Sequence, residues 1–102
     1  MGVAPVRVEA FSWVNRLVGG DGTGCVAVLE PAQPGDTVLS VLRRVGERHP
    51  ELGNAMWARG TGELAEYLVV IVNHRAAGAH GALDAELRPG DTVSLLGQYS
   101  GG

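Results

Sequence analysis

Two glycines, Gly101 and Gly102, end the sequence a few residues after a strand-like run at 92–96. Glycine has no side chain and adopts backbone angles closed to other residues, so such an end is thin enough to enter a narrow active site. A carboxylate is a poor electrophile, but conversion to an acyl-adenylate makes it reactive, and a sulfur nucleophile can then yield a terminal thiocarboxylate. This chemistry needs ATP and enzymes supplied by other proteins. The sequence therefore offers Gly102 as a group to be activated, the alternative being an inert, loose end.

The segment that carries this diglycine is long enough to reach into a partner. Residues 97–102, extended at about 3.3 Å each, span about 20 Å. We therefore expect a globular domain over residues 1–96 and a flexible tail over residues 97–102, with the body of the protein staying outside the partner's channel. The tail residues expected to contact that partner before the diglycine are Gly97, Gln98, Tyr99 and Ser100.

Other reactive side chains do not form a recognisable site. His49, His74 and His80 lack the spacing of metal ligands, so no metal site is expected. Cys25 is the only cysteine, which excludes a disulfide or a cysteine-based zinc site within one chain. It opens an apolar run, and we expect it to be buried as a small hydrophobic residue. No serine stands in a G-x-S-x-G setting, so no intrinsic enzymatic activity is expected.

The glycine-rich segment 19–24 invites a phosphate-binding interpretation, because Gly22, Gly24 and Ala27 fit a loose G-x-G-x-x-A pattern. That motif must open a helix, whose N-terminus holds the anion. Here it opens a strand-like run, so a turn between two strands is the better prediction.

Composition narrows the class of partner. The chain has 102 residues, enough for one domain, and a net charge of −3. This charge disfavours nucleic acid and anionic membranes as main partners, since both require clustered positive charge. No apolar run approaches the roughly 20 residues that span a bilayer, and the first residues lack a signal-peptide pattern, so a cytoplasmic protein is expected. All basic residues are Arg, so the chain cannot accept a copy of itself on a lysine.

The pattern of apolar residues predicts four main strands and one main helix. Strands are expected at 6–14, 25–30, 67–72 and 92–96, the third apolar at every position and therefore covered on both faces. Asp36 is the expected N-cap of a helix that ends at His49 because Pro50 follows. A second short helix at 51–58 and a helical turn at 82–87 are also expected.

This order indicates an α+β protein with a β-grasp fold, in which a mixed sheet of four to five strands is covered by one main helix. The first and last strands would lie parallel at the centre of the sheet. If Val93 and Leu95 face the helix, strand alternation places Ser94 and Leu96 on the opposite face. Leu96, Phe11 and one set of the 68–72 residues are expected to form an apolar patch beside the tail, which would serve as a partner-binding surface.

The chain resembles the MoaD/ThiS family of ubiquitin-like sulfur carrier proteins over nearly its whole length. The resemblance rests on the first strand, the 36–49 helix before Pro50, the run at 68–73, the motif Leu87-Arg88-Pro89-Gly90-Asp91-Thr92-Val93 and the terminal diglycine. It implies that Gly102 carries sulfur, and that no cofactor is bound. It also implies activation by an ATP-consuming, ubiquitin-activating-type adenylyltransferase and delivery of the sulfur to an acceptor biosynthetic enzyme. The tail departs from the MoaD pattern, since a proline pair common there is replaced by Gly97 and its neighbours, which leaves the receiving pathway open.

Two other functions stay open. The first is a protein modifier that couples Gly102 to lysines of other proteins. The second is a β-grasp binding subunit whose tail is inert.

Overall fold

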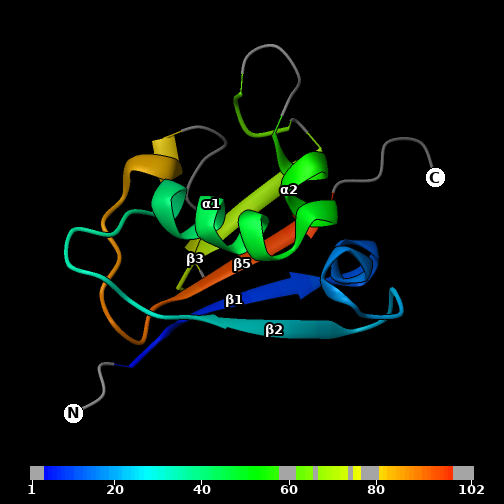
Figure 1. Cartoon of the computed structure of the whole chain (residues 1–102), viewed down its shortest axis with the longest axis horizontal. Coiled ribbons are helices and arrows are strands. Elements are labelled where there is room, and N and C mark those ends of the chain that lie inside the picture. The colour runs from blue at the N-terminus through cyan, green and yellow to red at the C-terminus, as the bar shows by residue number, and fades with distance from the viewer. Residues whose placement is uncertain (1–3, 58–61, 66, 74, 77–80, 98–102) are drawn as a thin grey trace.

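The computed structural model describes residues 4–57, 62–65, 67–73, 75–76 and 81–97 as a five-stranded sheet covered on one face by helices (Figure 1). The strands are β1 (Val6–Phe11), β2 (Cys25–Glu30), β3 (Leu68–Val72), β4 (Arg75–Ala76) and β5 (Thr92–Gly97). The helices are α1 (Val38–Arg48) and α2 (Pro50–Met56), with 3-10 segments η1 (Ser12–Val18) and η2 (Gly81–Asp84).

The sheet has the order β2-β1-β5-β3-β4, with β1 and β5 parallel and the other neighbours antiparallel. This confirms the α+β class and the parallel pairing of the first and last long strands. The core lies between the sheet and α1, where Val8, Val93 and Leu95 of the sheet and Val41 and Leu42 of the helix are fully or almost fully buried. Alternation along the strands sends their other residues to the opposite, open face.

The first strand is shorter than the sequence predicted. It ends at Phe11, because Ser12 adopts a positive φ of 54° and the chain turns into η1. The fully buried Asn15 fixes this turn: its amide donates to the Thr23 carbonyl at 2.8 Å, and its side-chain oxygen accepts from the Gly22 amide at 2.7 Å. The apolar residues that resembled a continuing strand instead cover one end of the sheet.

The helix begins one residue later than expected, with Thr37 as its N-cap. Thr37 and Ser40 form a reciprocal capping box, with Ser40 N donating to Thr37 Oγ1 at 3.2 Å and Thr37 N to Ser40 Oγ at 2.9 Å. The Asp36 carboxylate therefore does not cap the helix and is available to other partners. The helix ends as predicted before Pro50, which is the first residue of α2 rather than a simple stop.

Three further expectations need correction. Cys25 is exposed, because it opens the edge strand β2 and lies opposite Phe11 on the open face. Strand β3 buries Leu68 and Val70, whereas Val69, Ile71 and Val72 are half-buried, so it is covered fully on one face only. The helical turn expected at 82–87 is the 3-10 segment Gly81–Asp84.

The two α-helices cross closely at glycines. A Cβ on Gly53 would lie 2.7 Å from the carbonyl oxygen of Gly46, so this contact requires the absence of a side chain. Within the described part of the chain, no helix has the length and apolar character needed to cross a bilayer.

Candidate functional site

The end of β5 brings together the described residues that the sequence placed near the tail. The parallel register pairs Ala10 with Leu95, so one step further sets Phe11 beside Leu96. Phe11 also pairs with Cys25, and Leu96 with Val69. These four residues form a continuous row across the open face, which we call the terminal row: Cys25, Phe11, Leu96 and Val69.

The terminal row is accessible and mostly apolar. Phe11, Leu96 and Val69 are half-buried, and Cys25 is exposed. Burial, and to a lesser degree the nearby carboxylate of Glu9, raise the pKa of the Cys25 thiol above its usual value. The thiol is therefore protonated at neutral pH and contributes apolar surface rather than a nucleophile.

Polar side chains of the two central strands adjoin the terminal row on the same face. Ser94 Oγ donates to Glu9 Oε1 at 3.2 Å, and Arg7 Nε lies 2.9 Å from Glu9 Oε2. The two central strands are thus apolar where β5 ends and polar toward the middle of the face. The strands on either side keep apolar residues there, with Ala27 opposite Glu9 and Ile71 opposite Ser94. Accessible apolar side chains bordered by polar groups are typical of a protein-binding surface.

The opposite side of the same strand end is covered by an aromatic side chain. Gly97, which the sequence assigned to the tail, is the last residue of β5 and pairs with Leu68. The indole of Trp13 occupies the space that a side chain at residue 97 would fill. Trp13 in turn lies 5.8 Å from Tyr67 between ring centroids, with the rings tilted by 48°. Sequence reasoning missed Trp13, which reads as one more apolar residue of a continued strand.

The remaining predicted site residues lie outside the described residues. These are Gln98, Tyr99, Ser100, Gly101 and Gly102.

A cluster of ion pairs joins the C-terminal end of β2, at Glu30, to α1. The Arg44 guanidinium binds Asp36 through two nitrogens, each at 2.7 Å, and donates from Nε to Glu30 at 2.8 Å. Arg48 also pairs with Glu30. The Arg44 hydrogen bonds lower the pKa of Asp36 from 3.8 to about 2, despite the opposing effect of burial. Every charge has an opposite partner, which is the signature of a structural cluster rather than a reactive one.

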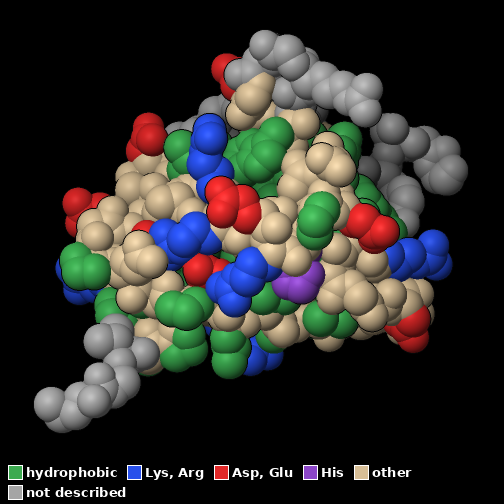
Figure 2. Space-filling model, in the orientation of Figure 1, with side chains coloured by type: hydrophobic (Ala, Val, Ile, Leu, Met, Phe, Trp, Pro, Cys, Tyr) green, Lys and Arg blue, Asp and Glu red, His purple; other side chains and the backbone are tan. Residues whose placement is uncertain are grey.

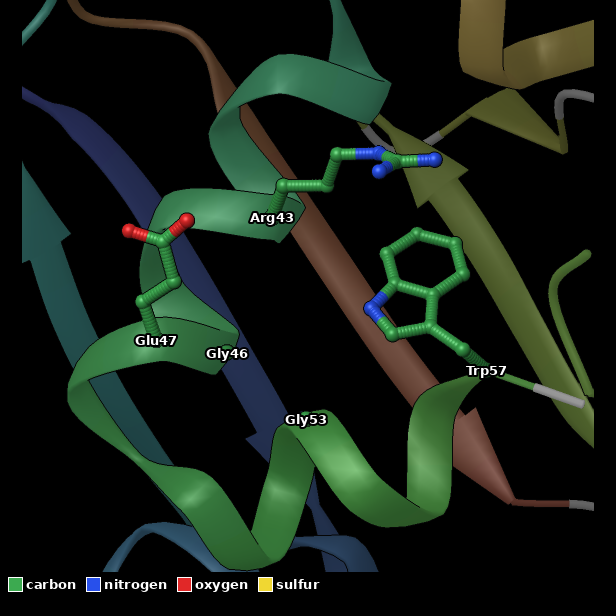
Figure 3. A pocket seen from close by; sticks show the side chains of 5 residues that line it. All are labelled: Arg43, Gly46, Glu47, Gly53 and Trp57. Atoms are coloured by element: carbon green, nitrogen blue, oxygen red, sulfur yellow. The ribbon is translucent and has the colours of Figure 1, made fainter. Parts of the chain in front are cut away.

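The helix-covered face carries a shallow hollow but no comparable site. Acidic and basic side chains are interspersed over this face (Figure 2). A hollow of about 260 Å³ lies between α1 and α2, where the Arg43 guanidinium sits 5.5 Å from the centre of the Trp57 ring and Glu47 points away from it (Figure 3). Among the residues that the structure describes, no three His, Cys, Asp or Glu side chains gather where they could hold a metal ion.

The parallel β1–β5 pair at the centre of the mixed sheet and the helix that crosses it define a ubiquitin-like β-grasp protein. The sequence profile of the ThiS family matches residues 21–102, and the chain belongs to that family. This confirms the family resemblance.

Solved structures agree with this assignment. Small archaeal modifier protein 1 from Methanosarcina acetivorans is similar with a TM-score of 0.74 and 20% identity, covering 100% of both chains. The Haloferax volcanii small archaeal modifier protein 1 has a TM-score of 0.71 and 25% identity, covering 94% of this chain and 99% of that one. A chain of the Amycolatopsis orientalis BexX/CysO complex has a TM-score of 0.70 and 27% identity, covering 95% and 99%. No curated protein sequence matches the chain.

Proposed function

We propose that this protein is a sulfur carrier whose Gly102 carboxylate is activated and sulfurated by partner enzymes. A carboxylate oxygen attacks the α-phosphorus of ATP and pyrophosphate leaves, which gives an acyl-adenylate. A sulfide-equivalent nucleophile then attacks the acyl carbon and AMP leaves. The net change is one sulfur in place of one oxygen, and the chain acts as a co-substrate rather than a catalyst.

The extent of the family match and the geometry at the end of β5 together carry this proposal. The ThiS match extends through Gly102, and the tail follows directly from a strand end whose open side is the accessible terminal row. A carrier needs both features, because the partner must hold the body while the terminus enters the active site. Support for a dedicated partner also comes from the similar chain of the BexX/CysO complex.

Intact mass spectrometry tests this function. The full chain is incubated with a ubiquitin-activating-type adenylyltransferase of the same organism, Mg-ATP and inorganic sulfide. We expect a mass increase of one sulfur-for-oxygen exchange, located at Gly102 by fragmentation. A chain that keeps its mass while a known family carrier gains sulfur under the same conditions would falsify the proposal.

Conjugation to other proteins is the second candidate function, favoured by the similarity to small archaeal modifier proteins. It shares the adenylation step but ends in an amide bond to a lysine of another protein. Covalent adducts of the tagged chain in cells, resistant to thiols and absent without Gly102, would distinguish it from sulfur transfer.

The terminal row gives a prediction about partner docking. Leu96→Glu places a charge at the centre of the apolar surface, where binding would strip it of water without supplying a partner. We expect the affinity for the adenylyltransferase, measured by calorimetry, to fall at least about tenfold.

Leu29→Glu is the matched control for that variant. Leu29 lies on the same face but pairs with Arg7, away from the terminal row, and its side chain is 55% exposed. It should bind like the wild type. Equal losses in both variants would place the docking surface elsewhere.

A further inference from the structure

Gly97 lies between two different surfaces at the end of β5. Its neighbour Leu96 faces the open side, whereas the helix-covered side of Gly97 is filled by the Trp13 indole. A Cβ built on Gly97 would overlap the indole atoms Cε2, Nε1 and Cζ2. The strand end and the indole are therefore in direct contact, and the contact exists only because residue 97 has no side chain.

The indole is held in place from both sides. On one side, Trp13 precedes Val14 and Asn15, which are fully buried and anchor η1 to the core and to the 22–24 turn. On the other, its ring packs on Tyr67, whose hydroxyl donates to the Ala55 carbonyl of α2. Figure 1 shows η1 at the end of the sheet toward which β1 and β5 run. The Trp13 side chain is thus held in a fixed position by contacts on two sides.

We propose that Trp13 is a positioning residue that keeps Gly97 in the β5 ladder and so fixes the point from which the tail extends into the partner's active site. The inference rests on the proposed activation of Gly102. Pinning at Gly97 leaves five residues beyond the sheet, a reach of about 17 Å when extended. Each further residue that leaves the β5 ladder would lengthen the segment beyond the sheet by about 3.3 Å.

The two sides of the β5 end have different roles in this proposal: one binds the partner enzyme and the other positions the C-terminus. The terminal row docks the body, whereas Trp13 lies on the helix-covered side and sets where the terminus starts. Loss of Trp13 should therefore leave docking intact and slow the adenylation step, because displacement of a reacting group by about 1 Å can cost up to about a hundredfold in rate. We expect Trp13→Ala to lower kcat for ATP–pyrophosphate exchange about tenfold, with KM for the carrier within about twofold of wild type.

A double-mutant cycle tests whether Trp13 acts through Gly97. Gly97→Ala alone drives a methyl group into the indole and should also lower kcat. In the Trp13→Ala background the same methyl finds vacated space, so the second substitution should cost little. Trp57→Ala is the control, since it removes the other tryptophan, which lies over Arg43 between the helices.

A second readout does not depend on the partner. Amide hydrogen exchange of the free protein should show faster exchange for the Gly97 amide in Trp13→Ala, with unchanged protection at Val8 and Val93. If Trp13→Ala does not fold, Gly97→Ala is compared in the wild-type and Trp13→Phe backgrounds, where the smaller ring should reduce its cost.

The outcomes separate this inference from the proposed function. A wild-type chain that no adenylyltransferase activates overturns the proposed function, and hydrogen exchange still decides whether Trp13 pins Gly97. A wild-type chain that is activated, with kcat and exchange unchanged in Trp13→Ala, overturns the positioning role. Additive losses in the cycle, or an equal fall in Trp57→Ala, overturn it as well.

Discussion

Removing Gly101 and Gly102 is expected to abolish sulfur transfer to this chain, although the shortened protein still ends in a carboxylate. The truncation draws that carboxylate back by about 7 Å relative to the docked body. It also puts the bulkier Ser100 at the terminus, where only glycine keeps the approach narrow. Because acyl activation depends on the position of the reacting group to about 1 Å, we expect a loss of more than a hundredfold, measured as thiocarboxylate formed by intact mass spectrometry.

Gly102→Ala is the control for length. It preserves the number of residues and adds only a methyl group, so it should retain more activity than the truncated chain. Both variants should bind the adenylyltransferase like the wild type, since neither alters the terminal row. Full sulfuration of the truncated protein would mean that the diglycine is not the reactive end.

Replacing Asp36 by Asn is expected to cause a large loss of stability. The Asp36 carboxylate is buried and accepts hydrogen bonds from four donors: two Arg44 nitrogens, the Ser40 hydroxyl at 2.9 Å and the main-chain N–H of Gln33 at 2.8 Å. An Asn amide keeps one oxygen and turns its NH2 group toward donors. We expect the free energy of unfolding to fall by about 2–3 kcal/mol in chemical denaturation.

Asp84→Asn makes the same chemical change on an exposed residue and should be close to neutral. A comparable loss in both variants would contradict the role assigned to the buried cluster.

The same carboxylate gives the protein a defined acid sensitivity. The pKa of Asp36 is lowered from 3.8 to about 2 in the folded state, so the ionised form is favoured by folding. Its contribution is fully present above about pH 4 and is lost as the pH falls toward 2, amounting to about 2 kcal/mol. Thermal unfolding between pH 2 and 6 should show this loss in the wild type, and Asp36→Asn should flatten that part of the profile.

The sequence predicted the fold class because its signals are local and strong. Alternation in residues 6–11, the spacing of Val38, Val41, Leu42 and Val45, and Pro50 after His49 each specify an element directly. The β1–β5 pairing follows from the order of those elements, which is the β-grasp order. These features need no knowledge of side chains brought together from distant parts of the chain.

The errors arose where tertiary contacts override local pattern. Residues 6–14 alternate in part and are rich in Val, Phe and Trp, which predicted one long strand. Only the buried Asn15 and its bonds to the 22–24 turn explain why the chain leaves the sheet at Ser12. Asp36 is a good N-cap by residue type, but Arg44 competes for its carboxylate. Cys25 has the residue type of a core position, yet it lies on an edge strand facing outward.

Local pattern along the strands also predicts part of the candidate site. Phe11 and Leu96 could be set on one face by counting along two strands. The contact of Trp13 with Gly97 joins residues more than eighty positions apart through the absence of a side chain, for which a single sequence gives no signal.

The parallel pairing of β1 with β5 also determines how the protein can be handled. Arg7 pairs with Thr92 at the start of both strands, and Gly90 N donates to the Pro5 carbonyl at 3.2 Å, so the chain enters the sheet at the end opposite Gly97 (Figure 1). The six residues of β5 separate these ends by about 20 Å. An affinity tag or fluorophore attached before Ala4 is therefore joined to the sheet at the end opposite the terminal row and Gly97. Immobilised through that tag, the protein presents the terminal row to solution.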